Sequence, residues 1–257
     1  MTGRQRVLVW GAGAIGGTIG AYLRRAGHDV TFVDRAPDHV QAITDRGLTV
    51  TGPFGDFAVD APALTPGALS GTWDTVLLCT KAQDTAAAGA QLAPHLSPGG
   101  AVVSVQNGLN PLILNGVLGE ERVLGSFVNF GADYLEPGVV HYGGRGAVVI
   151  GEQSGAVTAR VQALHALLRT FDEDAILSRN VMGYLWGKLA YGALLFATAV
   201  TNDSIADALA RPEDRALYTE LGREVLRVTA AHGVTPEAFN GFDPRAFRPG
   251  ASDAEAH

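Results

Sequence analysis

The sequence predicts an α/β protein in which a doubly wound, mostly parallel sheet is followed by an all-α region. Two observations support this fold class. The apolar runs typical of strands are continuous rather than alternating, which indicates a sheet covered by helices on both faces. After residue 157, apolar positions recur almost entirely at helical spacing. We therefore predict two domains, 1–177 and 178–257, of which the second is expected to be incomplete.

The first elements alternate between strand and helix. The pattern predicts strand 6–10, helix 14–26, strand 30–33 and helix 37–46, in this order. Each of the two helices is followed by a glycine, Gly27 or Gly47, a residue that commonly closes helices. This alternation is typical of the beginning of a parallel sheet.

The central part of the chain mixes turns with further strands. Residues 48–59 predict a small hairpin, because Gly-Pro at 52–53 and Gly-Asp at 55–56 are turn signals. The pattern then predicts strand 75–80, helix 84–93 and strand 101–105. Between 123 and 151 glycines separate short apolar runs, which predicts antiparallel strands that finish the sheet.

The all-α region is expected to contain helices 157–170, 180–200, 203–210 and 213–232. The tail from Thr235 onward is rich in Pro, Gly, Ala and charge, and it holds no run long enough to complete a helical domain. We expect this tail to be loose or cut short.

Composition and charge exclude several classes of function. With 257 residues, 47% of them hydrophobic, the chain is long enough to bury a full core. Its net charge of −7 and the lack of a dense Lys/Arg tract argue against a nucleic-acid-binding surface, because neutralising phosphates needs clustered cations. No apolar stretch approaches the ~20 residues of a membrane span, the longest being 189–200. We therefore expect a cytoplasmic protein whose partners are small molecules.

The cysteine and histidine content predicts no metal site. Cys79 is the only cysteine, so neither an intrachain disulfide nor a cysteine-based zinc site can form. The seven histidines are scattered, without the i, i+4 pairs or the company of carboxylates that is typical of a metal site. We expect most of them to lie at the surface or in loops.

A glycine-rich turn stands between the first predicted strand and the first predicted helix. It consists of Gly11, Ala12, Gly13, Ala14, Ile15 and Gly16, and its position is the one that a dinucleotide-binding fingerprint requires. Gly11 permits the tight turn, Gly13 lets the backbone approach a pyrophosphate, and Gly16 allows close packing of helix on strand. The N-terminus of the helix adds free N–H groups and partial positive charge. The turn therefore predicts a Rossmann-type domain that binds NAD(H) or NADP(H).

Two residues at the end of the second strand bear on the choice of cofactor. Asp34 lies 18 residues after Gly16, near the expected position of a ribose-binding acid. A carboxylate there accepts a hydrogen bond from a ribose 2′-hydroxyl and repels a 2′-phosphate, whereas the neighbouring Arg35 is able to bind that phosphate. Arg35 is equally compatible with a solvated loop position. The dipeptide leaves NAD and NADP both open.

Two further loops follow predicted strands, at the edge where ligands bind in open α/β sheets. They are Thr80-Lys81-Ala82 and Gln106-Asn107-Gly108. We expect the polar residues of both loops, Lys81 and Asn107 among them, to face the ligand cleft. The alternatives are a cation at a helix start for Lys81 and an ordinary turn for Asn107.

Lys188 is the catalytic candidate. It is the only charged residue between Arg179 and Asp203, in a segment otherwise suited to burial. An ammonium group there must either extend to solvent or line a polar cavity. In a cleft it would donate a proton to a carbonyl oxygen as a hydride reaches the carbon, and its charge would stabilise the forming alkoxide.

Together these motifs resemble the ketopantoate reductase (2-dehydropantoate 2-reductase) family in their order and spacing. They are the turn 11–16, Thr80-Lys81-Ala82, Gln106-Asn107-Gly108 and the stretch 185–190, Leu-Trp-Gly-Lys-Leu-Ala, and the resemblance covers roughly residues 6–232. It implies a Rossmann domain, a helical domain and NADPH-dependent reduction of a 2-oxo acid. It also implies that Lys188 is the general acid, that Asn107 contacts cofactor and substrate, that Lys81 lies near the cofactor, and that Arg35 reads the 2′-phosphate.

The sequence departs from the family in two ways. Gly192 and Phe196 stand where the family usually has asparagines that orient the substrate from the same helix face. Phe196 suggests a bulkier or more apolar substrate than ketopantoate, or else a residue that packs between helices. The family's later substrate-binding serine and glutamate cannot be matched before His257, so we expect either a shortened product or a partner chain that supplies that wall.

Other functions stay open from the sequence. The departures at Gly192 and Phe196 are compatible with a non-catalytic sensor that binds a nicotinamide dinucleotide. A 3-hydroxy-acid or imine dehydrogenase of the same superfamily is a further alternative. The Ala- and Leu-rich helices of an incomplete domain suggest association, and we expect a homodimer.

Overall fold

The computed structural model describes residues 3–248 and 250–252, and it divides the chain into two compact units, Met1–Val181 and Met182–His257. The division follows Val181, whereas the sequence placed it after residue 177. Each unit has its own apolar core. Residues 253–257, the end of the tail that was expected to be loose, lie outside the described residues.

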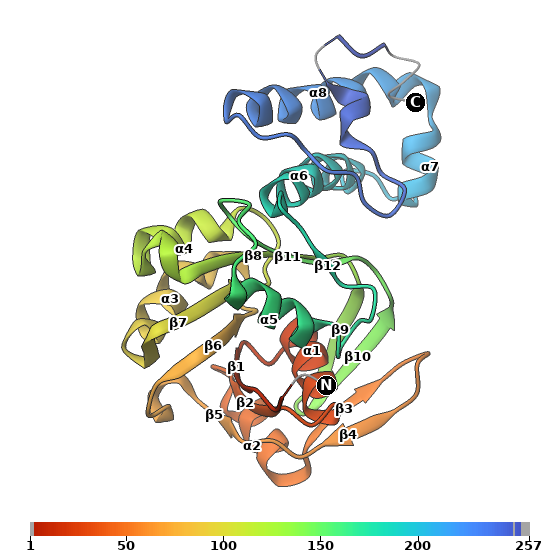
Figure 1. Cartoon of the computed structure of the whole chain (residues 1–257). Helices are drawn as coiled ribbons and strands as arrows, with labels where there is room; N and C mark the ends of the chain where they lie inside the picture. The colour runs from red at the N-terminus through yellow and green to blue at the C-terminus, as the bar shows by residue number, and fades with distance from the viewer. Residues whose placement is uncertain (1–2, 249, 253–257) are drawn as a thin grey trace. The chain divides into compact units, whose positions relative to one another are not determined.

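The first unit is built on an eight-stranded, mostly parallel sheet (Figure 1). Its strands in spatial order are β12 (Ile176–Leu177), β11 (Val148–Glu152), β8 (Val123–Val128), β7 (Leu96–Ser104), β6 (Trp73–Leu78), β1 (Arg6–Trp10), β2 (Asp29–Val33) and β5 (Ala63–Leu64). Only the pair β8–β11 is antiparallel among these neighbours. The predicted α/β class and its parallel sheet are confirmed.

Helices cover both faces of this sheet, which explains the continuous apolar strands. The helices are α1 (Ala14–Arg25), α2 (Pro37–Arg46), α3 (Thr85–Leu92), α4 (Asn110–Leu118) and α5 (Ala159–Leu168). Successive residues of β1 point to opposite faces: Val7 and Val9 belong to the core that contains α1 and α5. Leu8 and Trp10 belong to the core that contains α3 and α4.

A second, four-stranded sheet packs on α1. Its order is β4 (Phe57–Val59), β3 (Leu48–Thr51), β10 (Val139–Gly144) and β9 (Gly131–Glu136). The antiparallel pair β3–β4 confirms the hairpin expected at 48–59. The expectation that all strands between 123 and 151 finish the main sheet is wrong for β9 and β10. β9 is mostly exposed and β10 alternates between buried and more exposed residues, so neither suits a sheet covered on both faces.

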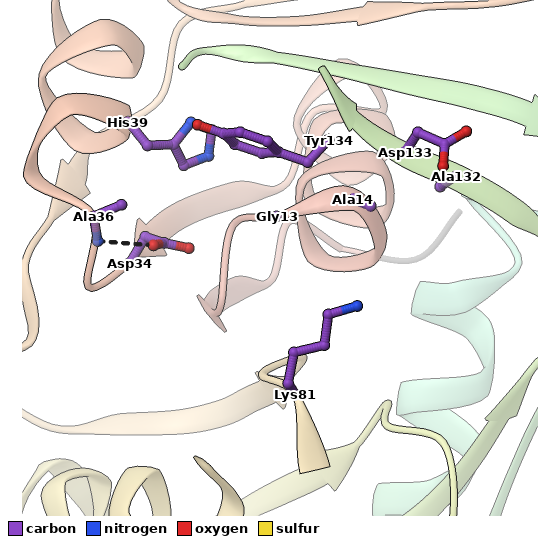
Figure 2. A pocket seen from close by; sticks show the side chains of 9 residues that line it. All are labelled: Gly13, Ala14, Asp34, Ala36, His39, Lys81, Ala132, Asp133 and Tyr134. Carbon is purple, nitrogen blue, oxygen red and sulfur yellow. Dashed lines mark hydrogen bonds between the residues drawn. The ribbon is translucent and has the colours of Figure 1, made fainter. Parts of the chain in front are cut away.

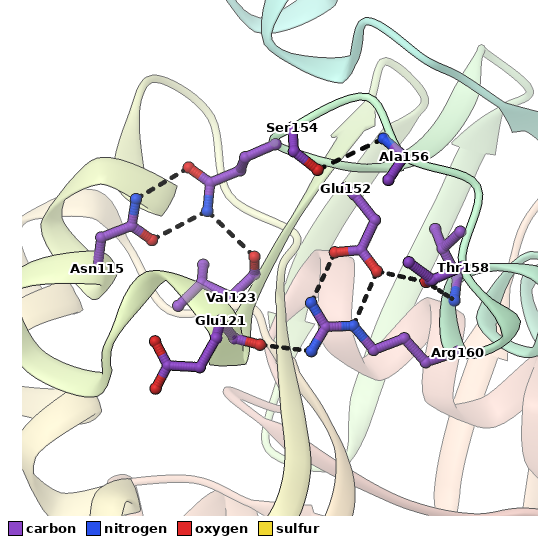
Figure 3. A network of polar contacts seen from close by, with 10 residues as sticks. Asn115, Glu121, Val123, Glu152, Ser154, Ala156, Thr158 and Arg160 are labelled. Carbon is purple, nitrogen blue, oxygen red and sulfur yellow. Dashed lines mark hydrogen bonds and ion pairs between the residues drawn. The ribbon is translucent and has the colours of Figure 1, made fainter.

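A partly buried polar network joins β11 to α5 in the first unit (Figure 3). The Arg160 guanidinium donates two hydrogen bonds to the Glu152 carboxylate, at 2.8 and 2.7 Å, and the Thr158 hydroxyl donates a third. Burial acts to raise the pKa of Glu152, but the hydrogen bonds from Arg160 and Thr158 and the charge of Arg160 outweigh it, so that the pKa is lowered. Glu152 is therefore a fully paired, structural carboxylate.

The second unit is helical. It contains nearly all of α6 (Val181–Thr198) together with α7 (Ile205–Ala210) and α8 (Arg215–Ala231). Its core gathers Ala190, Leu194, Tyr218, Leu226 and Phe247. The helical region that was expected after the sheet is thus confirmed.

The described part of the tail is folded, so the expectation of a loose tail is wrong for these residues. Pro244–Phe247 forms a short 3-10 helix, and Phe247 is only 6% exposed. The Phe247 ring lies so close to α8 that a Cβ on Gly222 would come within 2.5 Å of it. Phe239 is also 6% exposed, and its ring lies edge-on to that of Tyr191 in α6, so several contacts anchor a segment whose composition is typical of loops.

The remaining 3-10 helices are Pro66–Ala68, Ala82–Asp84, Ala93–His95, Glu120–Arg122 and Pro212–Asp214. Within the described residues, none of the helices combines the length and the hydrophobicity needed to cross a bilayer.

Candidate functional site

The glycine-rich turn connects β1 to α1 and needs glycine at two positions for steric reasons. Gly11 has a φ of +98°, and a Cβ there would lie 2.9 Å from the backbone of Cys79 and Thr80. A Cβ on Gly16 would lie 2.0 Å from the Gly11 carbonyl oxygen. The two glycines therefore let the turn pack against the loop that follows β6.

Gly13 differs from these two glycines because the space beside it is open. A Cβ on Gly13 would meet no atom within 4 Å. Gly13 is also the N-cap of α1, where no side chain caps the helix and no acidic residue occupies the first turn. This helix end is able to receive an anion from outside the chain.

Asp34 ties the end of β2 to the glycine-rich turn. Its Oδ2 accepts a hydrogen bond from the Ala12 N–H at 2.8 Å, and its Oδ1 accepts one from the Ala36 N–H at 3.0 Å. Both carboxylate oxygens are held by backbone donors, so the side chain has a fixed orientation.

His39 of α2 stabilises the same turn through its imidazole ring. Its Nε2 lies 2.9 Å from the Ala12 carbonyl oxygen, and its Nδ1 accepts a hydrogen bond from the Gly138 N–H at 2.9 Å. Because Nδ1 is an acceptor, the ring proton resides on Nε2 and is donated to Ala12. We expected most histidines to lie at the surface or in loops, and His39 is an exception, because it lies on α2 and is 1% exposed. Its helical spacing from Ala42 and Ile43, both buried, was the available signal.

These residues border a pocket of about 340 Å³ (Figure 2). It is lined by Gly13, Ala14, Asp34, Ala36, His39, Lys81, Ala132, Asp133 and Tyr134. Figure 2 shows Lys81 rising from the loop after β6 toward the glycine-rich turn. Four of the residues predicted from the sequence, Gly13, Ala14, Asp34 and Lys81, thus line one cavity.

Strand β9 of the second sheet supplies a wall that the sequence analysis missed. Ala132, Asp133 and Tyr134 line the pocket, and the Tyr134 ring lies edge-on to His39 with 5.1 Å between the ring centroids. No sequence motif indicated these residues, because their position depends on β9 belonging to the second sheet and not to the main sheet.

Arg35 does not line the pocket. Its guanidinium donates a hydrogen bond to Asp84 Oδ1 at 3.1 Å, and its side chain is 76% exposed. The structure therefore places Arg35 in an exposed ion pair with the start of α3, beside the pocket rather than in it.

Asn107 is exposed in the loop after β7 and is also absent from the pocket lining. A buried amide, Gln106, holds this loop to the loop after β6 by donating to the Thr80 carbonyl at 2.9 Å and to the Thr85 hydroxyl at 2.8 Å. Asn110 then donates to the Asn107 carbonyl at 2.6 Å. The expectation that the polar residues of this loop face the cleft is wrong for Gln106, which is 4% exposed and positions the loop instead.

Lys188 lies on α6 in the second unit. Its side chain is half-buried, and this burial lowers its pKa to about 8. The chain contains only two lysines, Lys81 and Lys188. An amine with this pKa is mostly protonated at neutral pH and gives up its proton more readily than an ordinary lysine.

Gly192 and Phe196 follow Lys188 on α6. A Cβ on Gly192 would meet no atom within 4 Å, so the space beside it is open. Phe196 is 81% exposed, which contradicts the interpretation that it packs between helices.

Residues 7–155 match the family model described as ketopantoate reductase PanE/ApbA. The chain belongs to the ketopantoate reductase family. The family predicted from the sequence motifs is thereby confirmed, and its named relatives are oxidoreductases. The matched residues all lie in the first unit.

Individual members of the ketopantoate reductase family extend the similarity. A 2-dehydropantoate 2-reductase of Halobacterium salinarum is 30% identical over 235 residues, covering 90% of this chain and 77% of the relative. One of Pyrococcus abyssi is 30% identical over 187 residues, covering 72% of this chain and 60% of the relative. The crystal structure of a PanE/ApbA family ketopantoate reductase from Ralstonia eutropha JMP134 is 30% identical, with a TM-score of 0.77 over 91% of this chain and 76% of that one.

Proposed function

We propose that this chain reduces a 2-oxo acid, ketopantoate or a bulkier relative, to the 2-hydroxy acid with NADH or NADPH. The observation that carries the proposal is the pocket at the open glycine-rich turn, where Gly13, Asp34 and Lys81 meet. The names of the relatives, 2-dehydropantoate 2-reductases, support the type of reaction.

The residues around the turn fit a nicotinamide dinucleotide. The uncapped N-terminus of α1 and the open space at Gly13 suit a pyrophosphate, and the Lys81 ammonium adds a positive charge opposite the turn. Asp34 suits a ribose hydroxyl, because each carboxylate oxygen keeps a free lone pair after accepting one N–H. When bound, the dihydronicotinamide supplies a hydride to the carbonyl carbon of the substrate.

Lys188 is proposed as the general acid. Its ammonium donates a proton to the carbonyl oxygen and stabilises the negative charge that develops there. The lowered pKa, about 8, supports this role, because a donor is most effective when its pKa lies near the working pH. Asn107 is proposed to contact cofactor and substrate, as the family resemblance implies.

Gly192 and Phe196 are proposed to shape the substrate site. Open space beside Gly192 and an exposed phenyl ring at Phe196 replace two polar side chains that the family usually has on this helix face. An apolar surface of this kind favours a 2-oxo acid with a larger or more apolar substituent than that of ketopantoate.

The proposal is tested by following nicotinamide oxidation with a panel of 2-oxo acids of increasing size. We expect Lys188→Ala to lower kcat by about 10²–10⁴-fold, the usual contribution of a general acid. Lys188→Arg retains the charge but holds its proton, so it should be nearly as defective. Arg215→Met, which removes an exposed cation of the same unit, serves as control. Full activity of Lys188→Ala would contradict the assignment, and tight nucleotide binding without turnover would favour a sensor.

The homodimer expected from the sequence stays a prediction. Several large apolar side chains of the second unit are exposed, among them Phe196 at 81% and Val200 at 86%. Such residues are compatible with an interface between two copies. Sedimentation equilibrium across a range of concentrations decides the point.

A further inference from the structure

We propose that the pocket selects NAD(H) over NADP(H), and that Asp34 is the residue that rejects the additional 2′-phosphate. This inference rests on the proposed function and deepens it. The sequence left the two cofactors open, because Asp34 and Arg35 favour opposite answers. In the structure Asp34 lines the pocket, whereas Arg35 does not.

Asp34 is not free to move aside. Its two oxygens accept hydrogen bonds from the N–H groups of Ala12 and Ala36. Ala12 belongs to the glycine-rich turn, and Ala36 is the N-cap of α2. Turning the carboxylate away from the pocket would leave both donors without this partner. A negative charge is therefore held at the pocket wall in every state that preserves the turn.

Further acidic residues strengthen this negative charge. Asp133 lines the same pocket from β9. Burial raises the pKa of Tyr134, and the charges of Asp38, Asp34 and Glu136 raise it further. Asp38 and Glu136 thus lie near enough to this lining residue to add negative charge beside the pocket, although they do not line it.

In the described part of the chain, no cation near the pocket forms an ion pair with Asp34. Among the described residues that line the pocket, Lys81 is the one cation, and it extends toward the glycine-rich turn (Figure 2). The Arg35 guanidinium pairs with Asp84 at 3.1 Å and does not line the pocket. His39 accepts a hydrogen bond at Nδ1 and donates from Nε2, which is the pattern of a neutral ring.

A ribose 2′-hydroxyl and a 2′-phosphate therefore meet this wall differently. The hydroxyl is a donor that Asp34 is able to accept, whereas the phosphate is an anion that offers it no proton. Bringing a dianionic phosphate next to a fixed carboxylate is unfavourable even in a high local dielectric constant. NAD(H) should bind more tightly for this reason.

The test measures dissociation constants of NADH and NADPH by isothermal titration calorimetry, which needs no turnover. For the unmodified chain we expect NADPH to bind at least about tenfold more weakly than NADH. Asp34→Asn, which keeps the shape and removes the charge, should narrow this ratio by strengthening NADPH and weakening NADH. Asp45→Asn makes the same change of charge on α2 away from the pocket lining and should leave the ratio unchanged.

A second variant keeps the proposal testable if Asp34→Asn does not fold. Asp84→Ala releases Arg35 from its ion pair and should strengthen NADPH binding severalfold with little effect on NADH. Equal or tighter binding of NADPH by the unmodified chain would overturn the inference and leave the proposed function standing. Failure to bind either nucleotide would overturn both.

Discussion

Glu152 and Asp34 are two carboxylates of the same unit with opposite surroundings. Glu152 has a side chain that is 5% exposed, and it receives two hydrogen bonds from Arg160, its ion-pair partner (Figure 3). Asp34 is half-buried at the edge of a pocket, and in the described part of the chain it receives backbone N–H donors but no ion pair (Figure 2).

This difference separates a structural charge from one that is available to a ligand. A buried carboxylate without a cation is unstable, so a network that only holds the fold provides the cation within the chain. At a binding site the polar groups stay accessible, and part of their interactions is completed by the ligand. The predictions below test the two sides of this comparison, beginning with the largest effect.

Gly13→Val should weaken nucleotide binding by at least about 100-fold, because the branched side chain would fill the space that the pyrophosphate needs. The folded chain should tolerate the change, since a Cβ on Gly13 meets no atom within 4 Å. Calorimetric titration measures the loss, and thermal unfolding checks the fold. Gly99→Val, at an equally open glycine in β7, is the matched control. Unchanged affinity of Gly13→Val would show that the nucleotide does not lie on this turn.

Arg160→Ala should lower the free energy of unfolding by about 2–3 kcal/mol, because it leaves Glu152 buried without its cation. This loss is at or below the lower end of the range for breaking a buried ion pair, because the Arg160 side chain is 37% exposed and water screens its charge. Urea unfolding measures the change. Nucleotide affinity should stay the same. A loss of nucleotide affinity in Arg160→Ala would contradict the interpretation that Glu152 has a purely structural role.

The activity should fall about tenfold per pH unit once the pH rises above about 8, because Lys188 then loses the proton that it donates. Burial lowers this pKa below the usual lysine value, in contrast to Glu152, whose hydrogen-bonded partners lower its pKa against the effect of burial. Reductive ¹³C-methylation followed by NMR reads the pKa directly, because Lys81 is the only other lysine. A titration near the usual lysine value would contradict the assignment.

The local elements were predictable because local patterns determine them. The strands and helices of the main sheet follow from continuous apolar runs ended by glycines, and the steric need for glycine at Gly11 and Gly16 follows from the strand–turn–helix order. The polar residues Lys81 and Asp34 line one pocket because parallel strands end at the same edge of the sheet.

The features that the sequence did not predict share a physical cause, because each depends on contacts between segments far apart in the chain. β10 pairs with β3 and β9 pairs with β10, so neither strand finishes the main sheet, and this places Asp133 and Tyr134 at the pocket. His39 lies on the buried face of α2, but one of its two hydrogen-bond partners, Gly138, lies 99 residues further along the chain. Phe239 and Phe247, both buried, anchor the tail that its composition predicted to be loose.

The sequence by itself determined the α/β class, the glycine-rich turn and the family, because these depend on periodicity and on residues adjacent in the chain. Only the tertiary structure decided which partners the charged side chains have. It fixed Asp34 between two backbone donors, paired Arg35 with Asp84, and enclosed Glu152 with Arg160. The reason is that a charged side chain's role is set by the partners that reach it and by its access to water, and both arise when distant segments pack together.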